Sequence, residues 1–445
     1  MKKVLIANRG EIASRIIKTC HEMGIETVAV YSDADQELPF VKNATVAHRI
    51  GEPPVMKSYL QMDKILEIAE QEKVDAIHPG YGFLSENTIF AKAVAKRGII
   101  FIGPTPQVIS LMGDKVKARQ TMIEAGVPVV PGSDRSIQAI EEAMKLAAEY
   151  GYPVMLKASG GGGGIGMVCC HSEQELQKAF QTTKTRAKSY FGNDEMFIEK
   201  FIPNARHIEV QIFGDHHGNM VHLFERDCSI QRRNQKVIEE TPSPFLSDET
   251  REEICNAAIK AAKFVDYTNA GTIEFIVDEQ ENFYFLEMNT RLQVEHAITE
   301  MITNLDLVKW QLLVANGEKL PLSQKEISHE GHSIEFRVYA EDPIKFFPSP
   351  GKIEEFTLPH NDKGVRVDNG YETGTTVTPF YDPMIAKIIV KANNRPEAIQ
   401  TAKAYFNQIV IKGIKTNIPL FQEIINEDSY LKGEYTTNYL ITRGN

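Results

Sequence analysis

Cysteine is scarce in this sequence, which has five in 445 residues. None of them has the spacing of a metal site, and the adjacent pair at 169 and 170 is interpreted as small strand residues, not as a redox pair. So few thiols, odd in number, argue against a disulfide-stabilised secreted fold and predict reduced thiols in a cytoplasmic protein. The five are Cys20, Cys169, Cys170, Cys228 and Cys255.

Long apolar runs and an excess of positive charge are also lacking. The apolar run before Asn8 has only four residues, too few for a signal-peptide core, and no run has the roughly 20 residues that a membrane helix needs. The net charge is −11 and the basic residues are scattered, which is atypical of nucleic-acid binders. We therefore expect neither a membrane nor a nucleic acid as partner, and a local pocket for a small anion stays possible.

The first third of the chain alternates short apolar strands with helical patterns. The strand KVLIAN is followed by IASRIIKTCHEMG, with apolar residues at helical spacing, and then by the strand ETVAVYS. Later strands, VDAIHPG and GIIFIGP, each lead into a Gly/Pro loop. This order predicts a wound, parallel α/β sheet with ligands at the carboxyl ends of its strands. The first turn lacks G-x-G-x-x-G spacing, which favours an ordinary strand-to-helix turn over a dinucleotide fingerprint.

Changes of pattern divide the chain into three predicted units, the number that its length suggests. The α/β unit covers residues 1–113, and a second unit covers 114–330. Within the second, a smaller unit at about 131–203 has a helix and the strands YPVMLKAS, GMVCC and EMFIEKFI. The third unit, 331–445, begins with strand patterns such as SIEFRVYAED. The predicted fold class is therefore multidomain, α/β and α+β.

Five consecutive glycines, Gly160 to Gly164, follow the apolar strand PVML, and Ile165 separates them from Gly166. Ordering a glycine costs more conformational entropy than ordering any other residue type, and a hairpin tip needs only one or two glycines. We predict a flap whose backbone amides close over a polyphosphate, with Lys157 at its base. No Lys-Ser/Thr pair follows, so the run is not a Walker A loop.

The segment GTIEFIVDEQENFYFLEMN reads as two strands joined by a polar turn. That turn places Asp278 opposite Phe283 and Glu274 opposite Glu287, and like charges directly opposed repel. Asn289, two residues after Glu287, shares its face. Two carboxylates and an amide oxygen together favour a hard cation, most simply Mg²⁺ carried by a nucleotide. A solvated hairpin face is the alternative, which the flanking apolar residues disfavour.

The same alternation places Arg291, Gln293 and Glu295 on that face if the second strand continues. A cation, an amide and a carboxylate in that position could hold a small anion and remove a proton from it. Surface strands also alternate polar residues in this way, and the pattern alone favours neither interpretation.

Together these motifs resemble biotin carboxylase, a family of the ATP-grasp superfamily. The resemblance rests on Lys157 with the glycine run, on the paired Glu274 and Glu287, and on EMNTRLQVEH. It includes further segments in the same order, as far as about Thr436: VLIANRGEIA, IHPGYGFLSEN, FIGP, MGDK, RHIEVQ, ERDCSIQRRNQK and FFPSPG. It implies an N-terminal α/β domain, an ATP-grasp domain with a glycine-rich lid, and a C-terminal biotin carboxylase domain.

The resemblance also implies a reaction. ATP, with Mg²⁺ or Mn²⁺, would phosphorylate bicarbonate to carboxyphosphate, and the carboxyl group would then move to N1′ of biotin. ATP would be held by Lys115, Lys157, Gly163, Gly164, Glu199, Lys200, Phe201, Ile202, His207, Gln231, Asn234, Glu274 and Glu287. The metal would be held by Glu274, Glu287 and Asn289, bicarbonate by Lys236, Arg291, Gln293 and the Val294 backbone, and biotin by Tyr81 and Arg337. The implied catalytic residues are Glu295 as base, with Arg291, Lys236 and Arg337.

Three positions depart from the family pattern. Ile165 stands where the lid usually has a basic residue, which predicts weaker affinity for ATP. Asn234 replaces a usual His and can still hydrogen-bond a ribose. Ala297 replaces a usual Pro, which predicts a looser turn after Glu295.

The segment EAMK at residues 142–145 resembles a biotin-attachment site. Ile137, Ile140, Met144 and Ala147 nevertheless follow helical spacing, and Gly151 ends the pattern, which predicts a plain helix. Biotin would then arrive on a separate biotin carboxyl carrier protein, with carboxyltransferase subunits as further partners. The resemblance also suggests a homodimer.

The leading hypothesis is therefore the biotin carboxylase subunit of an acyl-CoA carboxylase, preferably acetyl-CoA carboxylase in fatty acid biosynthesis. Another ATP-grasp ligase acting on a different carboxylate is the alternative among enzymes. A nucleotide-binding regulatory subunit with impaired catalysis is supported only by the three departures. A dehydrogenase leaves the central motifs unexplained. The final acceptor stays open among acetyl-CoA, propionyl-CoA, pyruvate and others.

Overall fold

The computed structural model describes residues 1–133, 135–159, 166–359 and 364–443. Its first unit consists of β1 (Lys3–Ile6), α1 (Gly10–Glu22), β2 (Glu26–Ser32), α2 (Pro39–Asn43), β3 (Val46–Gly51), α3 (Met62–Gln71), β4 (Ala76–His78), α4 (Thr88–Lys96) and β5 (Ile100–Phe101). The strands form a parallel sheet in the order β3-β2-β1-β4-β5, which confirms the predicted wound sheet. Helix α1 forms because Ile12, Ile16 and Cys20 recur at helical spacing and are all buried.

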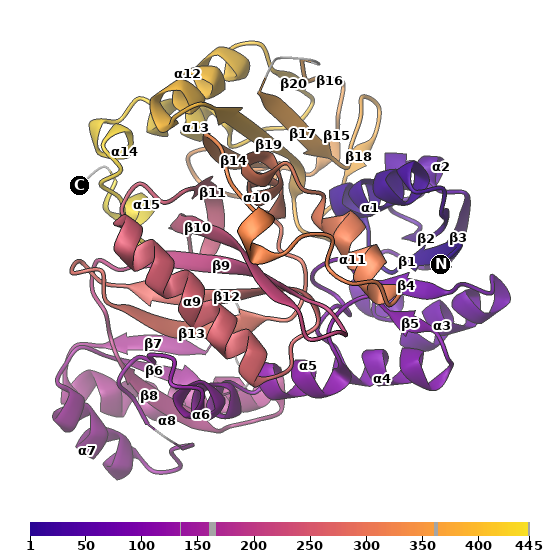
Figure 1. The fold of residues 1–445 in the computed structure, drawn as a ribbon. Coiled ribbons are helices and arrows are strands. Elements are labelled where there is room, and N and C mark those ends of the chain that lie inside the picture. The colour runs from indigo at the N-terminus through magenta and orange to yellow at the C-terminus, as the bar shows by residue number, and fades with distance from the viewer. Residues whose placement is uncertain (134, 160–165, 360–363, 444–445) are drawn as a thin grey trace.

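A small unit lies at one end of the molecule (Figure 1). After α5 (Pro106–Gly113) and α6 (Lys115–Glu124), it comprises α7 (Ile140–Tyr150), β6 (Val154–Ala158), β7 (Met167–Cys170), α8 (Glu173–Phe191) and β8 (Met196–Lys200). The three strands form an antiparallel sheet with β6 in the middle. The EAMK segment lies in α7, which confirms the predicted helix. The helix begins at Ile140 and does not include Ile137. The Ile137 amide instead donates to the Met196 carbonyl at 2.6 Å, in a β-bridge.

An antiparallel sheet of eight strands forms the centre of the molecule, in the order β13-β12-β9-β10-β11-β14-β19-β17. The strands are β9 (Arg206–Gly214), β10 (Met220–Arg232), β11 (Gln235–Thr241), β12 (Asn269–Val277), β13 (Phe283–Asn289), β14 (His332–Tyr339), β17 (Val365–Asn369) and β19 (Met384–Ala392). Strands β14, β19 and β17 come from the third predicted unit and continue the sheet of the second. Residues of both units therefore share one continuous surface.

The two faces of this sheet differ in chemistry. Ile208, Val210 and Ile212 of β9 pack in an apolar cluster with α9 (Asp248–Phe264), which crosses one face in Figure 1. Glu209 and Gln211 of the same strand are buried on the opposite face. That face is covered by α10 (His296–Thr303), whose Thr299 hydroxyl accepts from the buried Arg226 at 3.0 Å. Polar side chains buried in this way need partners, so this face is where chemistry is expected.

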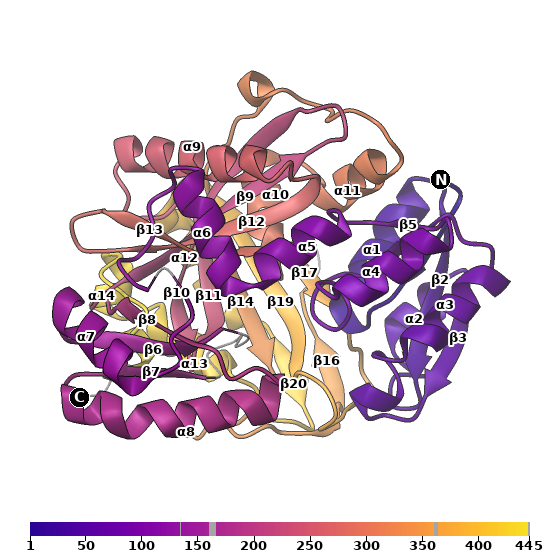
Figure 2. The same cartoon turned by 90° about the horizontal axis from the view of Figure 1, so that it is seen from below.

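The remaining elements complete the C-terminal part, and Figure 2 shows the molecule from below. Helix α11 (Leu307–Ala315) contacts β12 and α1. Two short sheets pair β15 (Gly351–Lys352) with β18 (Thr376–Val377), and β16 (Glu355–Thr357) with β20 (Val410–Lys412). Four helices follow β19 in the chain: α12 (Arg395–Phe406), α13 (Ile418–Ile424), α14 (Asp428–Leu431) and α15 (Tyr439–Thr442). Two 3₁₀ turns lie at Val55–Lys57 and Gln324–Glu326.

The first unit packs closely against the end of the central sheet. Gly370, just after β17, lies so near α1 that a Cβ atom there would stand 2.6 Å from the Glu11 nitrogen. Glycine is thus required for this approach, which brings Glu11 to the face covered by α10. Within the described part of the chain, no helix combines the length and the apolarity needed to cross a membrane.

Candidate active site

A row of carboxylates crosses three strands of the central sheet. Glu209 of β9 pairs with Glu274 of β12, and Glu274 pairs with Glu287 of β13. Directly paired residues point to the same face. The predicted opposition of Glu274 and Glu287 is therefore confirmed. Sequence reasoning missed Glu209, because the alternation in RHIEVQ shows a polar face but not which strand lies beside it.

The register around that pair differs from the prediction in one respect. Phe283 pairs with Val277 and not with Asp278. The register shifts between Glu274 and Phe275, where β13 has one extra residue, and this bulge restores the glutamate pair. Asp278 belongs to the turn, where its amide donates to the Asn282 carbonyl at 2.9 Å.

The Lys236 ammonium on β11 is surrounded by three carboxylates. Its Nζ atom lies 2.5 Å from Glu209 Oε2, 2.8 Å from Glu274 Oε1 and 2.7 Å from Glu295 Oε1. Burial opposes the charge on Lys236, but the three glutamates raise its pKa well above the ordinary value. Burial likewise opposes ionisation of Glu274, yet Lys236 and His207, the latter at 3.2 Å, hold the pKa of Glu274 well below its usual range. Lys236 is therefore the cation that binds this cluster together.

Glu295 joins Lys236 to Arg337. The Glu295 side chain is fully buried just before α10, and its Oε2 atom lies 2.8 Å from Arg337 Nη2 on β14. Arg337 also donates from Nε to Glu239 Oε1 at 2.6 Å. Although burial raises the pKa of Glu295, the attraction of Lys236 and Arg337 holds it well below the ordinary value. Glu295 is thus an ionised carboxylate held between two cations.

The residues before Glu295 gather by a different route from the one predicted. Strand β13 ends at Asn289, so the strand does not continue as the alternation argument requires. The chain turns away because Glu86 accepts from the Thr290 amide at 2.9 Å and from Arg291 Nε at 3.0 Å. Arg291 then donates to Gln293 Oε1 at 2.8 Å. Sequence reasoning also missed Glu86, which follows the GYGFLS segment of the first unit.

The predicted metal ligands offer oxygen atoms on one face of β12 and β13. Asn289 Oδ1 accepts from Arg291 Nη2 at 3.0 Å, and Asn289 Nδ2 is buried with no hydrogen-bond partner among the described residues. Glu287 lies 3.6 Å from the Lys115 ammonium and is partly exposed. Carboxylate and amide oxygens are the ligands that Mg²⁺ prefers, so this donor set fits such an ion.

Two other groups in the described chain bring potential ligand atoms within 4.8 Å of one another, namely His207–Glu209–Glu274 and Glu209–Cys228–Glu295. Burial raises the pKa of the Cys228 thiol well above its ordinary value, which disfavours the thiolate that binds metals. Of the predicted metal ligands, only Glu274 occurs in these two groups, in the first of them.

Some of the predicted nucleotide-binding residues belong to the small unit. Lys157 on β6 is hydrogen-bonded to Glu199 on β8, and Arg119 Nη1 lies 3.5 Å from Glu199. In the adjoining segment, the Lys200 amide donates to the Pro131 carbonyl at 2.8 Å. The Phe201 amide donates to the Pro153 carbonyl at 3.1 Å. Ile202 is partly buried beside them. The predicted Gly163 and Gly164, and the departure at Ile165, lie outside the described residues.

Asn234 occupies the turn between β10 and β11. Arg233 has φ +51° and Asn234 has φ +64°. Asparagine is among the few non-glycine residues that adopt such a conformation readily, which is a local reason for Asn at this position. Gln231, just before the turn, donates to the Cys228 carbonyl at 2.9 Å. Ala297 is fully buried in α10, and the predicted looseness of its turn stays a prediction.

Tyr81 lies beyond the carboxyl end of β4, in a turn held by Asn8. The Asn8 side chain donates to the Pro79 carbonyl at 2.7 Å and to the Tyr81 carbonyl at 2.8 Å. Gly80 there has φ +62° and leaves no room for a side chain beside Asn8. The Tyr81 hydroxyl is hydrogen-bonded to Glu11 of α1.

Comparison with known proteins agrees with this architecture. Three family models match in chain order: "Biotin carboxylase, N-terminal domain" over residues 1–109, "Carbamoyl-phosphate synthase L chain, ATP binding domain" over 114–323, and "Biotin carboxylase C-terminal domain" over 335–442. Together the three matches cover nearly all of the chain.

Individual relatives cover the chain almost completely. The chain is 58% identical to a biotin carboxylase of Halalkalibacterium halodurans over 99% of this chain and 97% of that protein. It is 48% identical to a pyruvate carboxylase subunit from Methanothermobacter thermautotrophicus, over 98% and 89%. The biotin carboxylase domain dimer of Hydrogenobacter thermophilus 2-oxoglutarate carboxylase, solved with MgADP, ADP and bicarbonate, has a TM-score of 0.96 at 48% identity, over 99% and 97%. This chain is therefore a member of the biotin carboxylase family.

Proposed function

We propose that this protein carboxylates biotin on a separate carrier protein, using ATP and bicarbonate through carboxyphosphate. The observation that carries the proposal is the ionised, fully buried Glu295 between Lys236 at 2.7 Å and Arg337 at 2.8 Å. A base beside two fixed cations suits an anionic substrate that must lose a proton. Membership of the biotin carboxylase family supports the same reaction.

Bicarbonate would enter at Lys236, with Arg291, Gln293 and the Val294 backbone around it. In the present arrangement the Lys236 ammonium satisfies three carboxylates. An entering anion would compete with these carboxylates for the Lys236 ammonium, which would weaken the contact between Lys236 and Glu295. The pKa of Glu295 would then rise toward the value that a general base needs. The related 2-oxoglutarate carboxylase domain was solved with bicarbonate, which supports such a site.

The nucleotide would lie between the central sheet and the small unit. Lys115 and Lys157 would face its phosphates, and Glu199 to Ile202, with His207, Gln231 and Asn234, would face adenine and ribose. Glu274, Glu287 and Asn289 would hold Mg²⁺, or Mn²⁺ in its place. The ion would supply neutralisation of the phosphate charge. Gly163 and Gly164 of the lid would close over the phosphates and exclude water from the unstable intermediate.

Biotin would contact Tyr81 and Arg337. Arg337 stays charged at every physiological pH, so it suits the oxyanion of a biotin enolate. Its distance of 2.8 Å from Glu295 would place the enolate beside the base. The carrier would be a separate biotin carboxyl carrier protein, because EAMK lies within helix α7 instead of on a hairpin turn. We propose a cytoplasmic homodimer, in line with the dimer of the 2-oxoglutarate carboxylase domain.

The experiment that tests the reaction measures ADP release from Mg-ATP with bicarbonate, with and without free biotin. We expect turnover that needs bicarbonate, is stimulated by biotin and is lost in Glu295→Ala. Turnover that biotin does not stimulate would indicate another carboxylate substrate. ATP binding without turnover would point to a regulatory subunit. A biotin signal for the purified chain on a streptavidin blot would contradict the separate carrier.

For the acceptor we propose acetyl-CoA, and hence fatty acid biosynthesis. The test isolates the native complex through a tag on this chain and supplies labelled bicarbonate with acetyl-CoA, propionyl-CoA, pyruvate or 2-oxoglutarate. Fixation of label only with acetyl-CoA would support the proposal. Preference for another acceptor would overturn it.

A further inference from the structure

A buried lysine outside the proposed catalytic set contacts the loop at residues 290–295, between β13 and α10, here called the bicarbonate loop. Lys387 lies in β19 and is fully buried. It pairs directly with Arg337 on one side and with Asp368 on the other, so its side chain lies on their face of the sheet. A buried ammonium persists only when hydrogen bonds and opposite charges satisfy it, so the identity of its partners shows what it holds.

The partners of Lys387 come from three separate parts of the chain. Its Nζ atom donates to the Val294 carbonyl at 2.7 Å. The same atom lies 3.4 Å from Glu11 Oε1 and 3.8 Å from Asp368 Oδ2. Glu335, on the neighbouring strand, is also buried nearby. Lys387 therefore ties the first unit, the sheet and the loop before Glu295 to one another.

Glu11 continues this contact toward the proposed biotin site. The same Oε1 atom that faces Lys387 is hydrogen-bonded to the Tyr81 hydroxyl. Burial raises the pKa of Glu11 to about 7, against the opposing attraction of Lys387. A polar chain thus runs from Tyr81 through Glu11 and Lys387 to Val294.

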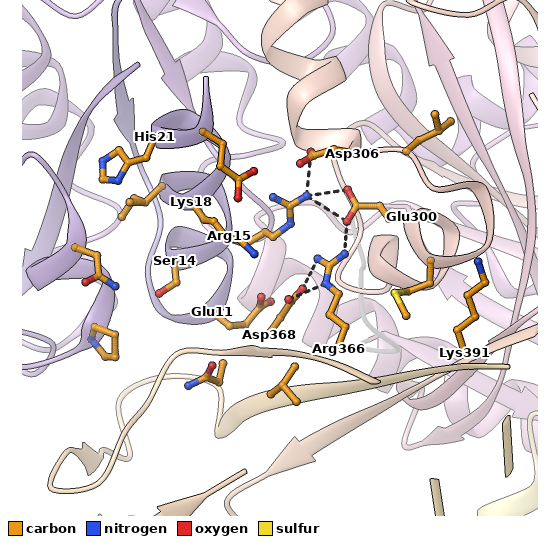
Figure 3. Close-up of a pocket in the computed structure, with 18 of the residues that line it drawn as sticks. Glu11, Ser14, Arg15, Lys18, His21, Glu300, Asp306, Arg366, Asp368 and Lys391 are labelled. Atoms are coloured by element: carbon orange, nitrogen blue, oxygen red, sulfur yellow. Dashed lines mark hydrogen bonds and ion pairs between the residues drawn. The ribbon is translucent and has the colours of Figure 1, made fainter. Parts of the chain in front are cut away.

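Glu11 is one of the residues that line a charged pocket. The pocket has a volume of about 1210 Å³. Figure 3 shows Glu11 in it beside Asp368 and Arg366. Arg366 binds Asp368 at 2.6 Å and Glu300 at 2.6 Å, and Arg15 binds Glu300 at 2.9 Å. Asp368 and Glu300 therefore have strong cationic partners of their own. Lys387, by contrast, faces Glu11 at 3.4 Å and also donates to the Val294 carbonyl.

The contact has a direct geometric consequence for the site. The Val294 carbonyl belongs to the peptide group that joins Val294 to Glu295. Fixing that carbonyl fixes the plane of the peptide and with it the position of the Glu295 Cα atom, from which the side chain extends. Lys236 and Arg337 hold the carboxylate end of the same side chain. Lys387 thus fixes the backbone end of the proposed base.

We propose that Glu11 and Lys387 are positioning residues that couple the biotin side of the site, at Tyr81, to the bicarbonate loop, at Val294. The inference rests on the proposed function, which assigns those two sides. Neither residue touches a substrate in this scheme. Their effect is to keep the two sides in one fixed relation, which a carboxyl transfer between two bound molecules requires.

The test uses Tyr81→Phe, which removes one hydroxyl and keeps the ring. We expect it to raise the KM for bicarbonate by roughly three- to tenfold, although Tyr81 is on the biotin side, because the hydrogen bond to the buried Glu11 is lost. Lys387→Met should raise the KM for both bicarbonate and biotin by a similar or larger factor. The KM for ATP should stay within about twofold in both. Glu11→Gln serves as the milder variant if Lys387→Met folds poorly.

A double-mutant cycle of Tyr81→Phe with Lys387→Met, or with Glu11→Gln, measures the coupling. If the chain of contacts acts as one unit, the double variant is no worse than the poorer single one. The matched control is Lys412→Met, which removes a lysine from the exposed 2.6 Å pair with Glu355. Additive effects, an unchanged KM for bicarbonate in Tyr81→Phe, or an equal rise of all three KM values would overturn the inference. A wild-type protein without biotin-stimulated turnover would instead refute the proposed function, and the coupling with it.

Discussion

Glu295 and Arg337 form a buried ion pair, with Oε2 and Nη2 2.8 Å apart. The two residues belong to different parts of the chain, the segment before α10 and strand β14. Removing one partner of such a pair leaves the other charge uncompensated. The pair therefore makes the proposed base and the proposed enolate-binding cation dependent on each other.

Glu295→Gln tests the base while keeping the shape of the side chain. We expect kcat for biotin carboxylation to fall by roughly 100-fold or more, the typical contribution of a general base. Affinity for ATP should change little, and equilibrium binding of nucleotide measures it. Glu52→Gln, at an exposed glutamate paired with Lys57, is the control and should retain full activity. Retention of activity in Glu295→Gln would show that another group removes the proton.

Glu86→Gln tests the contact that turns the chain after β13. The variant loses the charge that faces Arg291, so this arginine is held less firmly at the proposed bicarbonate site. We expect the KM for bicarbonate to rise about fivefold, with the KM for ATP little changed, since a charge-assisted hydrogen bond is weakened. Steady-state kinetics measure both constants. Glu70→Gln, which breaks the Glu70–Arg97 pair in the same unit, is the matched control. Equal kinetics for the two variants would contradict the role of Glu86.

Stability at acid pH should depend on Glu240. This carboxylate is buried and binds Arg395 at 2.6 Å, His332 at 2.7 Å and the Tyr435 hydroxyl at 2.7 Å. Burial opposes its charge, but Arg395 and His332 lower its pKa from 4.5 to about 2. A carboxyl whose pKa is lower in the folded state stabilises the protein above its unfolded pKa, and the contribution is lost as the pH falls toward 2. It is worth roughly 3 kcal/mol.

Unfolding by urea, followed between pH 6 and pH 3, measures this contribution. The wild type should lose stability faster than Glu240→Gln as the pH falls below about 4.5. The variant should be less stable at pH 6, where the wild-type carboxylate is charged and bonded. Parallel curves for the two proteins would show that Glu240 does not titrate as described.

Ile165→Arg tests the departure in the glycine run. A cation in the lid would add an attraction to the ATP phosphates that the wild type lacks. We expect a lower KM for ATP, with the KM for bicarbonate unchanged. Ile165→Met, which changes shape without adding charge, is the control. An unchanged or higher KM for ATP in Ile165→Arg would count against the idea.

Local patterns in the sequence were sufficient for much of the fold. Helix α1, strand β2 and the hairpin that opposes Glu274 to Glu287 were all predictable, since periodicity and a short polar turn depend on residues close in the chain. The family resemblance added the identities of residues far apart, such as Lys236 and Arg337.

Tertiary structure alone decided the remaining contacts. Glu209 stands beside Glu274 because β9 pairs with β12, and Glu86 reaches Arg291 across 205 residues of sequence. The bulge in β13, the end of that strand at Asn289 and the contact of Lys387 with Val294 likewise follow from which strands become neighbours. Strand pairing and the burial of charge are non-local, because each depends on the partner that the folded chain brings near. The sequence by itself therefore determined which chemical groups are present, and the fold determined which of them form hydrogen bonds and ion pairs with one another.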